Sequence, residues 1–132
     1  MSKLRNENII YPELSYKIIG NAFEVFNELG SGHHEKYYER ALIESFKKNQ
    51  LQFQSQVPFV VKFQGKVIGR NYLDFLVDNK IIVELKKDNK FSKKHIDQVL
   101  EYLKITRLKL AILINFTRQG VVSKRIINFD IS

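Results

Sequence analysis

The sequence predicts an α/β fold in which helices flank a mixed β-sheet. Two segments with helical spacing of apolar residues open the chain, three strand-like runs separated by turn residues follow, and a third helical segment precedes a nearly continuous apolar run. This order, with a short final strand, fits a chain of 132 residues, which has room for one hydrophobic core. We therefore expect a single domain over residues 1–132.

The first two helices are predicted over residues 14–29 and 35–48. Pro12 suits the start of the first helix, and Gly30 suits its end because glycine readily adopts the backbone conformation that closes a helix. In both segments the apolar residues recur three or four positions apart. They are Ile18, Ala22, Val25, Phe26 and Leu29 in the first helix, and Tyr38, Leu42, Ile43 and Phe46 in the second.

Strands are predicted on both sides of a central hairpin. Residues 57–63 form the first strand, and the turn Gln64-Gly65-Lys66 reverses the chain into the second, in which Gly69 marks a bulge or a close backbone approach. Residues 108–116 are so continuously apolar that they indicate a strand buried on both faces. Residues 125–129 indicate a short final strand or edge.

The second and third strands form a hairpin whose loop length follows from the hydrophobic pattern. With the three-residue loop Asp78-Asn79-Lys80, each face of the hairpin receives one kind of pair, whereas a slip by one residue would mix carboxylates into the apolar face. The apolar face then holds the pairs Val77 with Ile81, Phe75 with Val83, and Leu73 with Leu85. The other face holds Leu76 with Ile82, Asp74 with Glu84, and Tyr72 with Lys86.

This register places two carboxylates opposite each other inside apolar strands. Acidic residues are depleted in strands, like charges directly opposed destabilise a sheet, and an unpaired buried charge is costly. A divalent cation between Asp74 and Glu84 would turn the repulsion into a ligand pair, with Lys86 on the same face. Structural ion pairs with Lys86 or Arg70 are the alternative.

A third helix is predicted to begin after Ser92, which suits the N-cap position, with Phe91 and Ile96 forming a hydrophobic staple. Gln98 and Tyr102 are four residues apart and share one flank of this helix. That flank either supports a site or is simply solvated. The core-facing residues are predicted to be Ile96, Val99, Leu100 and Leu103.

The charge balance points to a polyanionic partner. Lys and Arg number 22 against 14 Asp and Glu, so the formal charge is +8 and the pI is about 9.7. This balance is typical of nucleic-acid binding, although solubility alone also accounts for it. The absence of cysteine excludes disulfides and thiolate metal sites. Because residues 1–8 lack the apolar region of a secretory signal and no run is long enough to span a bilayer, we expect a cytoplasmic protein without a membrane partner.

Four motifs, in order along the chain, carry a resemblance to a known superfamily. They are Gly32-x-x-Glu35-x-x-Tyr38, Asp74, Glu84-Leu85-Lys86 and Gln98-x-x-x-Tyr102. The acids with the lysine resemble the D…(D/E)xK core of the PD-(D/E)XK nuclease superfamily, and the last motif is similar to the QxxxY motif of its RecB-like branch. The first motif, together with Leu113-Ile114-Asn115-Phe116, resembles the GxxExxY family.

The resemblance implies a restriction-endonuclease-like fold and a metal-dependent nuclease. It implies that Asp74, Glu84 and the backbone carbonyl of Leu85 bind Mg²⁺ or Mn²⁺, ions that prefer oxygen ligands. Lys86 would orient the attacking water, help to deprotonate it and then steady charge on the phosphate. Glu35 would hold the metal at the edge of the site, directly or through water. It also suits a first helical turn, where the helix dipole favours carboxylates.

The resemblance assigns supporting positions to three further residues. Gln98 and Tyr102 would position their helix against the site or contact the substrate backbone. Tyr38 would pack in the core with its hydroxyl at the edge of the site. The sequence departs from the superfamily pattern at Leu73, which stands in the place of the proline that gives the motif its name.

Two other polar segments carry weaker signals. His33 and His34 occupy positions that are usually apolar in the family, and adjacent histidines do not have the spacing of a helical metal pair, so we expect solvent exposure or a phosphate contact. The basic run 86–90, with Lys93 and Lys94, is either a solvated loop or a phosphate-binding segment beside the site.

Three functions are compatible with these observations. A metal-dependent nuclease, with DNA favoured over RNA, agrees with the presence of every polar site position. A nuclease-like fold that binds nucleic acid or a partner protein without cutting is the main alternative, and a small structural or oligomerising protein is the third. Because one small domain has no separate recognition module, strong specificity would require a homodimer or a partner.

Overall fold

A computed structural model describes residues 10–86 and 91–130 of the chain. Within this part the predicted element order is confirmed, and the final strand is a full strand of eight residues. The helices are α2 (Pro12–Leu29), α3 (Glu35–Lys48) and α4 (Lys93–Thr106). The strands are β1 (Phe53–Phe63), β2 (Lys66–Val77), β3 (Ile81–Lys86), β4 (Leu110–Thr117) and β5 (Gly120–Ile127).

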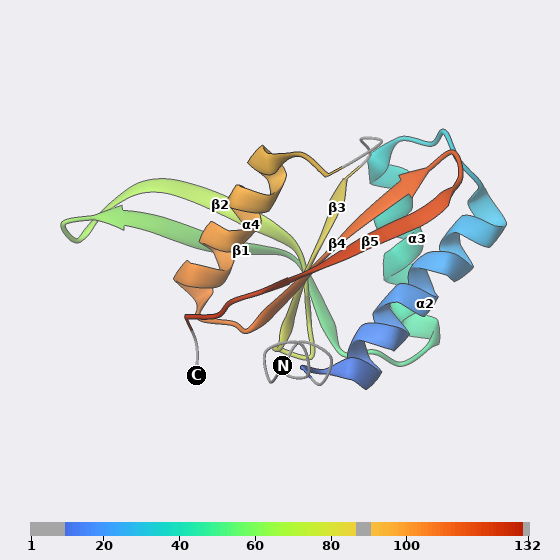
Figure 1. Ribbon diagram of the computed structural model, residues 1–132, viewed down its shortest axis with the longest axis horizontal. Helices are drawn as coiled ribbons and strands as arrows, with labels where there is room; N and C mark the ends of the chain where they lie inside the picture. Colours follow the sequence, from blue (N-terminus) through green and yellow to red (C-terminus); the bar gives the residue numbers. More distant parts are fainter. Residues whose placement is uncertain (1–9, 87–90, 131–132) are drawn as a thin grey trace.

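The five strands form one mixed sheet in the order β1-β2-β3-β4-β5. Among the described strands, only β3 and β4 run parallel to each other. Helix α4 forms the crossover connection between these two strands. Figure 1 shows α2 and α3 on one side of the strands and α4 on the other. The predicted mixed sheet flanked by helices, an arrangement consistent with a restriction-endonuclease-like fold, is confirmed.

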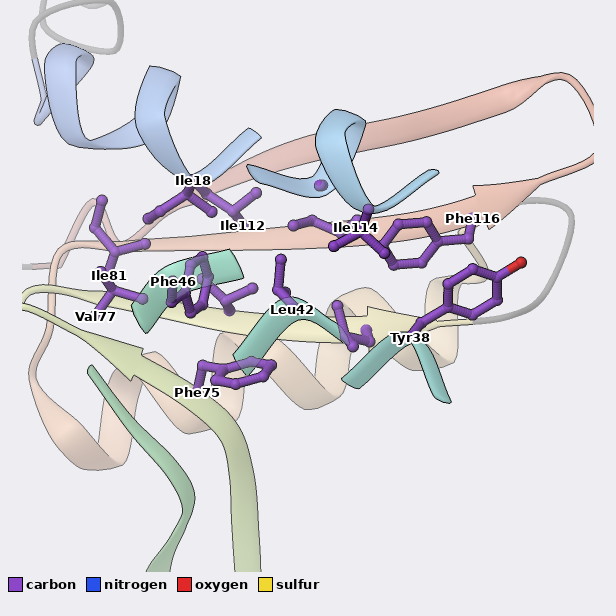
Figure 2. Close-up of a cluster of buried hydrophobic side chains, with 14 of the residues drawn as sticks. Ile18, Tyr38, Leu42, Phe46, Phe75, Val77, Ile81, Ile112, Ile114 and Phe116 are labelled. Atoms are coloured by element: carbon purple, nitrogen blue, oxygen red, sulfur yellow. The ribbon is translucent and has the colours of Figure 1, made fainter. Parts of the chain in front are cut away.

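Each face of the sheet has its own apolar cluster. The larger one joins α2 and α3 to the sheet, and Figure 2 shows Tyr38 beside Phe116 at one end of it, with their rings stacked 4.3 Å apart. The smaller one joins α4 to the opposite face through Val99, Tyr102 and Leu103. All eight residues of β4 are buried, as predicted for a strand covered on both faces.

The hairpin loop has the predicted length. Val77 pairs with Ile81, Leu76 with Ile82 and Phe75 with Val83, so residues 78–80 form the loop. Asp78 and Asn79 have positive φ values of 54° and 53°, which short polar side chains tolerate better than bulky ones.

Beyond Phe75, however, β2 leaves β3. Among the described residues the β2–β3 ladder ends at the pair Phe75 with Val83, and earlier residues of β2 pair with β1 alone, Leu73 with Val57 and Tyr72 with Pro58. The predictions that Leu73 lies opposite Leu85 and that Tyr72 lies opposite Lys86 are therefore wrong. Leu73 also packs in the cluster under α4, whereas Leu85 packs in the cluster under α2 and α3. The alternation of side chains between the two faces of β2 is interrupted between Leu73 and Phe75, where the pairing with β3 ends.

Three local predictions have different outcomes. The register shift in the β1–β2 pair, between Val61 and Lys62, confirms a bulge beside Gly69. The hydroxyl of Ser92 accepts a hydrogen bond from the backbone N–H of His95 at 3.2 Å, which confirms the cap of α4. Leu100 was expected in the core and is 41% exposed, because Tyr102 and Leu103 fill the face of α4 that meets the sheet.

No helix in the described residues is both long enough and apolar enough to cross a membrane.

Candidate active site

The candidate active site lies where β2 and β3 separate. There the backbone N–H of Asp74 donates to the Glu84 carboxylate at 2.6 Å. The backbone N–H of Leu85 in turn donates to the Asp74 carboxylate at 2.8 Å. Side-chain oxygens thus take over the hydrogen bonds that a continuing strand ladder would have made. Asp74 and Glu84 lie together as predicted, although they are joined by these bonds and not as a ladder pair.

Burial and mutual repulsion make both acids harder to ionise. Glu84 is 4% exposed, and burial, followed by the charge of Asp74, raises its pKa to about 8. Burial likewise raises the pKa of Asp74. The charge of Lys86, two residues after Glu84 on β3, acts in the opposite direction on the pKa of both acids. No ion pair joins either acid to Lys86 or Arg70 within the described residues.

Helix α3 brings two further carboxylates toward this pair. The charge of Glu35, the first residue of α3, raises the pKa of Glu84, and the charge of Glu39 raises that of Asp74. The amide of Gln56 on β1 donates to Glu39 at 2.6 Å and lies 3.4 Å from Asp74. Gln56 has a φ of 50°, a left-handed conformation that is uncommon within a strand.

Glu39 and Gln56 were not predicted from the sequence. The signal for Glu39 is its position four residues after Glu35, which places both on one face of the helix. For Gln56 the sequence offers only a polar stretch before residue 57, the predicted start of the first strand. Strand β1 in fact begins at Phe53, whose ring packs near Phe75 in the core.

Asn115 is a third residue that sequence reasoning did not place at the site. It is fully buried on β4, it is the register neighbour of Lys86, and neither its side-chain oxygen nor its nitrogen has a hydrogen-bond partner among the described residues. Its neighbour two residues earlier, Leu113, packs under α4, so Asn115 faces the same side. Buried unpartnered amides are rare, and they call for a functional explanation.

Helix α4 brings Tyr102 to the acids but leaves Gln98 at the surface. Tyr102 is 4% exposed, its ring meets Phe59 edge-on at 4.7 Å, and burial, with the charges of Glu84 and Asp74, raises its pKa to about 12. Its phenol is therefore a neutral hydrogen-bond donor near the carboxylates at neutral pH. Gln98 is exposed one turn earlier on the helix. The alternative that Gln98 and Tyr102 form a solvated flank of this helix is thus wrong for Tyr102.

The polar residues between α2 and α3 have structural bonds. The Tyr38 hydroxyl donates to the Gly30 carbonyl at 2.6 Å and accepts from the His33 N–H at 3.3 Å. The His33 ring lies 2.9 Å from the Leu29 carbonyl, and the ring of His34 caps α3. His34 is exposed as expected, whereas His33 is half-buried. These contacts support core packing for Tyr38.

The donor set suits a hard divalent cation. The described residues contain no group of three His, Cys, Asp or Glu side chains placed to hold one ion. They do contain two adjacent carboxylates, and within the described residues Oε1 of Glu84 accepts no hydrogen bond while Oδ1 of Asp74 has only the long contact with Gln56. Paired oxygens whose charges repel one another fit such an ion.

Residues 87–90 of the basic run lie outside the described residues, and Lys93 pairs with Asp97 at 3.0 Å.

Residues 12–127 match the family model of the PD-(D/E)XK nuclease superfamily. The chain belongs to this superfamily. The match runs from the first residue of α2 to the last residue of β5, so it includes every element that builds the site. PD-(D/E)XK nucleases generally use divalent metal ions, in agreement with the paired carboxylates. No protein with a curated functional description matches the sequence significantly.

Two solved structures resemble this chain in fold at low sequence identity. The crystal structure of SSO0001 has a TM-score of 0.58 and 21% identity, covering 70% of this chain and 50% of that one. An alkaline exonuclease from Laribacter hongkongensis, LHK-Exo, has a TM-score of 0.52 and 14% identity, covering 72% of this chain and 55% of that one. The chain thus spans about half the length of these two proteins.

Proposed function

We propose that this chain is a metal-dependent nuclease that hydrolyses phosphodiester bonds of DNA. The observation that carries the proposal is the buried pair Asp74 and Glu84, held by backbone N–H groups where two strands separate, with Lys86 beside it. Structural stability does not require two like charges at this place. The superfamily and the formal charge of +8 support a polyanionic substrate.

In this proposal Asp74, Glu84 and the Leu85 carbonyl hold Mg²⁺ or Mn²⁺, with Glu35 at the edge of the site. A bound divalent cation neutralises charge on the phosphate and makes water more acidic. The raised pKa of Glu84 means that its proton must leave before the carboxylate can serve as a ligand, so binding releases protons.

The remaining roles belong to neighbouring side chains. Lys86 orients the attacking water and then steadies the charge that develops on the phosphate. Asn115, its register neighbour, offers the lysine side chain an amide that has no hydrogen-bond partner among the described residues. Tyr102 donates a hydrogen bond toward the acids, and the exposed Gln98 contacts the substrate backbone. Tyr38 supports the site from the core.

Several finer assignments complete the proposal. The ordered motifs at Gly32, Glu35 and Tyr38 support membership of the GxxExxY family, and Gln98 with Tyr102 supports the RecB-like branch. One nuclease-like domain over residues 1–132, a homodimer and a cytoplasmic location stay predictions. So does the alternative in which the site binds nucleic acid or a partner protein without cutting it.

Cleavage assays separate the two functions. Purified protein is incubated with single- and double-stranded DNA and RNA in Mg²⁺, Mn²⁺ or EDTA, beside Glu84→Ala, Lys86→Ala and the surface control Lys104→Ala. We expect cutting of DNA that EDTA abolishes, a loss of at least about a hundredfold in the two site variants, and no change in the control. Cutting that persists in both site variants would come from a contaminant. Salt-sensitive binding without cutting would establish the binding module instead.

A further inference from the structure

The hairpin of β1 and β2 continues beyond the sheet as a two-stranded arm, residues 57–72. Only the last three residues of β2 pair with β3, whereas the pairing of β1 with β2 extends to Phe63 and Lys66. Figure 1 shows this arm reaching away from the other three strands. It joins the site directly, because Asp74 follows two residues after Tyr72.

The inner half of the arm is anchored, and its outer half is not. Phe59 packs edge-on against Tyr102, and Val57 and Val61 pack on the same cluster under α4. Beyond the bulge at Val61 the side chains turn to solvent, with Phe63 61% and Ile68 66% exposed. The arm is therefore held at a defined angle to the site while its tip remains accessible.

The charge of the arm has one sign. It carries three cations, Lys62, Lys66 and Arg70, all of them exposed, and the sequence has no Asp or Glu from residue 45 to residue 73. Within the described residues, none of the three forms an ion pair. Unpaired cations on a projecting ribbon attract phosphate groups, whose neutralisation dominates nucleic-acid affinity.

One face of the arm leads to the acids. Cross-strand partners share a face of the ribbon. Phe59 lies on the face that packs under α4, and the pairs Arg70 with Val60 and Tyr72 with Pro58 lie on the other face. That outward face presents the cation Arg70 four residues before Asp74 and the ring of Tyr72, 49% exposed, two residues before it. A substrate backbone that follows this face arrives at the carboxylates.

We propose that the arm is a β-ribbon that binds duplex nucleic acid beside the cleavage site. This inference rests on the proposed nuclease function and adds where the substrate lies. A two-stranded ribbon fits the major groove of a duplex. A second copy of the chain is a poorer occupant, because two arms facing each other would bring together three cations from each without an acid between them.

The arm also sets a length scale. Lys66 precedes Asp74 by eight residues, which is about 26 Å along an extended strand. That span corresponds to about 8 base pairs of duplex. Contacts from the tip thus reach about 8 base pairs from the scissile phosphate at most.

The test measures binding in EDTA, where no cleavage occurs. Fluorescence anisotropy follows the affinity for a labelled DNA duplex of about 20 base pairs between about 50 and 200 mM salt. We expect the slope of log K against log salt to fall in magnitude by about 1 in Lys62→Ala, Lys66→Ala or Arg70→Ala, and by about 3 in the triple variant. Lys17→Ala on α2, an equal loss of charge away from the arm, gives the background slope change.

The result that overturns the inference is a triple variant whose slope changes by no more than three times the change in Lys17→Ala, which corrects for its three lost charges. A triple variant that binds normally but changes the mass of the protein in solution also overturns it, in favour of a second copy. Lys62→Arg with Lys66→Arg keeps the charge and should keep the slope, which separates charge from folding. If wild type binds through the arm but never cuts, the nuclease proposal fails and this one stands. If the protein cuts DNA but its binding does not depend on the arm, this inference fails and the nuclease proposal stands.

Discussion

At the scale of single residues, the site is marked by side chains that take the place of backbone carbonyls as hydrogen-bond acceptors. The carboxylates of Asp74 and Glu84 accept N–H groups that carbonyls accept elsewhere in the sheet. Beside them the amide of Asn115 is buried with no hydrogen-bond partner in the part of the chain that the structure describes. An isolated protein gains nothing in stability from such an amide, so its presence is best explained by what it does to Lys86.

Substitution of Asn115 tests this explanation. Asn115→Leu, which is close in volume, removes two desolvated polar atoms, so the free energy of unfolding should stay equal or rise by about 1 kcal/mol. Turnover should nevertheless fall by about tenfold or more, as for other residues that orient a catalytic group. Chemical denaturation measures the first quantity and steady-state kinetics the second. A lower stability with unchanged turnover per folded molecule would show a structural role.

A double-mutant cycle gives the control for that experiment. If Asn115 acts through Lys86, the loss of turnover in Asn115→Leu should largely disappear when the same change is made in Lys86→Ala. Leu113→Ala on the same face of β4 lowers stability by creating a cavity, and its effect on turnover should be the same with or without Lys86. Equal losses for Asn115→Leu in both backgrounds would contradict the positioning role.

At the scale of elements, the connection between α2 and α3 aligns Glu35 with the sheet. Tyr38 is 1% exposed, stacks on Phe116 and bonds the Gly30 carbonyl through its hydroxyl, so it ties the end of one helix to the start of the next. The backbone of Gly30 has a φ of 73°, which favours glycine at this helix end.

Tyr38→Phe separates this structural role from a role at the site. The variant keeps the stacked ring and loses the hydroxyl, which leaves the Gly30 carbonyl without its partner. We expect the free energy of unfolding to fall by about 1 kcal/mol and the turnover of the folded protein to stay unchanged. Denaturant titration and cleavage kinetics measure these two quantities. Unchanged stability with reduced turnover would place the hydroxyl in the reaction.

The elements also show what the sequence can and cannot predict. The bounds of α3 and the loop at residues 78–80 follow from local periodicity, and both are confirmed. The same period-two pattern extended the hairpin past Phe75, because it does not show where a strand keeps one neighbour and loses the other. Leu100 was misplaced because the rotation of α4 depends on the sheet beneath it. Glu39 and Gln56 meet only through tertiary packing.

At the scale of the whole molecule, a basic chain brings two carboxylates together and places two more within range of their charges. Asp74 and Glu84 lie at the centre, and the charges of Glu35 and Glu39 act on them from α3. This concentration is unfavourable for the metal-free fold at the pH where the acids ionise. A cation at the centre would remove the penalty, so the pH dependence of stability should change sign or flatten when a divalent ion is present.

The metal-free protein should lose stability as pH rises. The pKa of Glu84 is about 8 in the folded chain against 4.5 ordinarily, so the folded state binds more protons than the unfolded state between these values. The unfolding temperature in EDTA should therefore fall between about pH 5 and 8. Glu84→Gln should flatten this fall, whereas Glu101→Gln, an exposed carboxylate on α4, should leave it unchanged. A rise over the same range would contradict the buried, protonated state.

Divalent cations should reverse that trend in the wild-type protein. A ligand that binds only the folded state stabilises it in proportion to the logarithm of its concentration over its Kd. Because protons compete for the same oxygens, Mg²⁺ or Mn²⁺ should raise the unfolding temperature more at pH 8 than at pH 5. Asp74→Asn and Glu84→Gln should abolish the increase, while Glu101→Gln keeps it. An equal increase at both pH values, or one that survives in the two site variants, would place the cation elsewhere on the molecule.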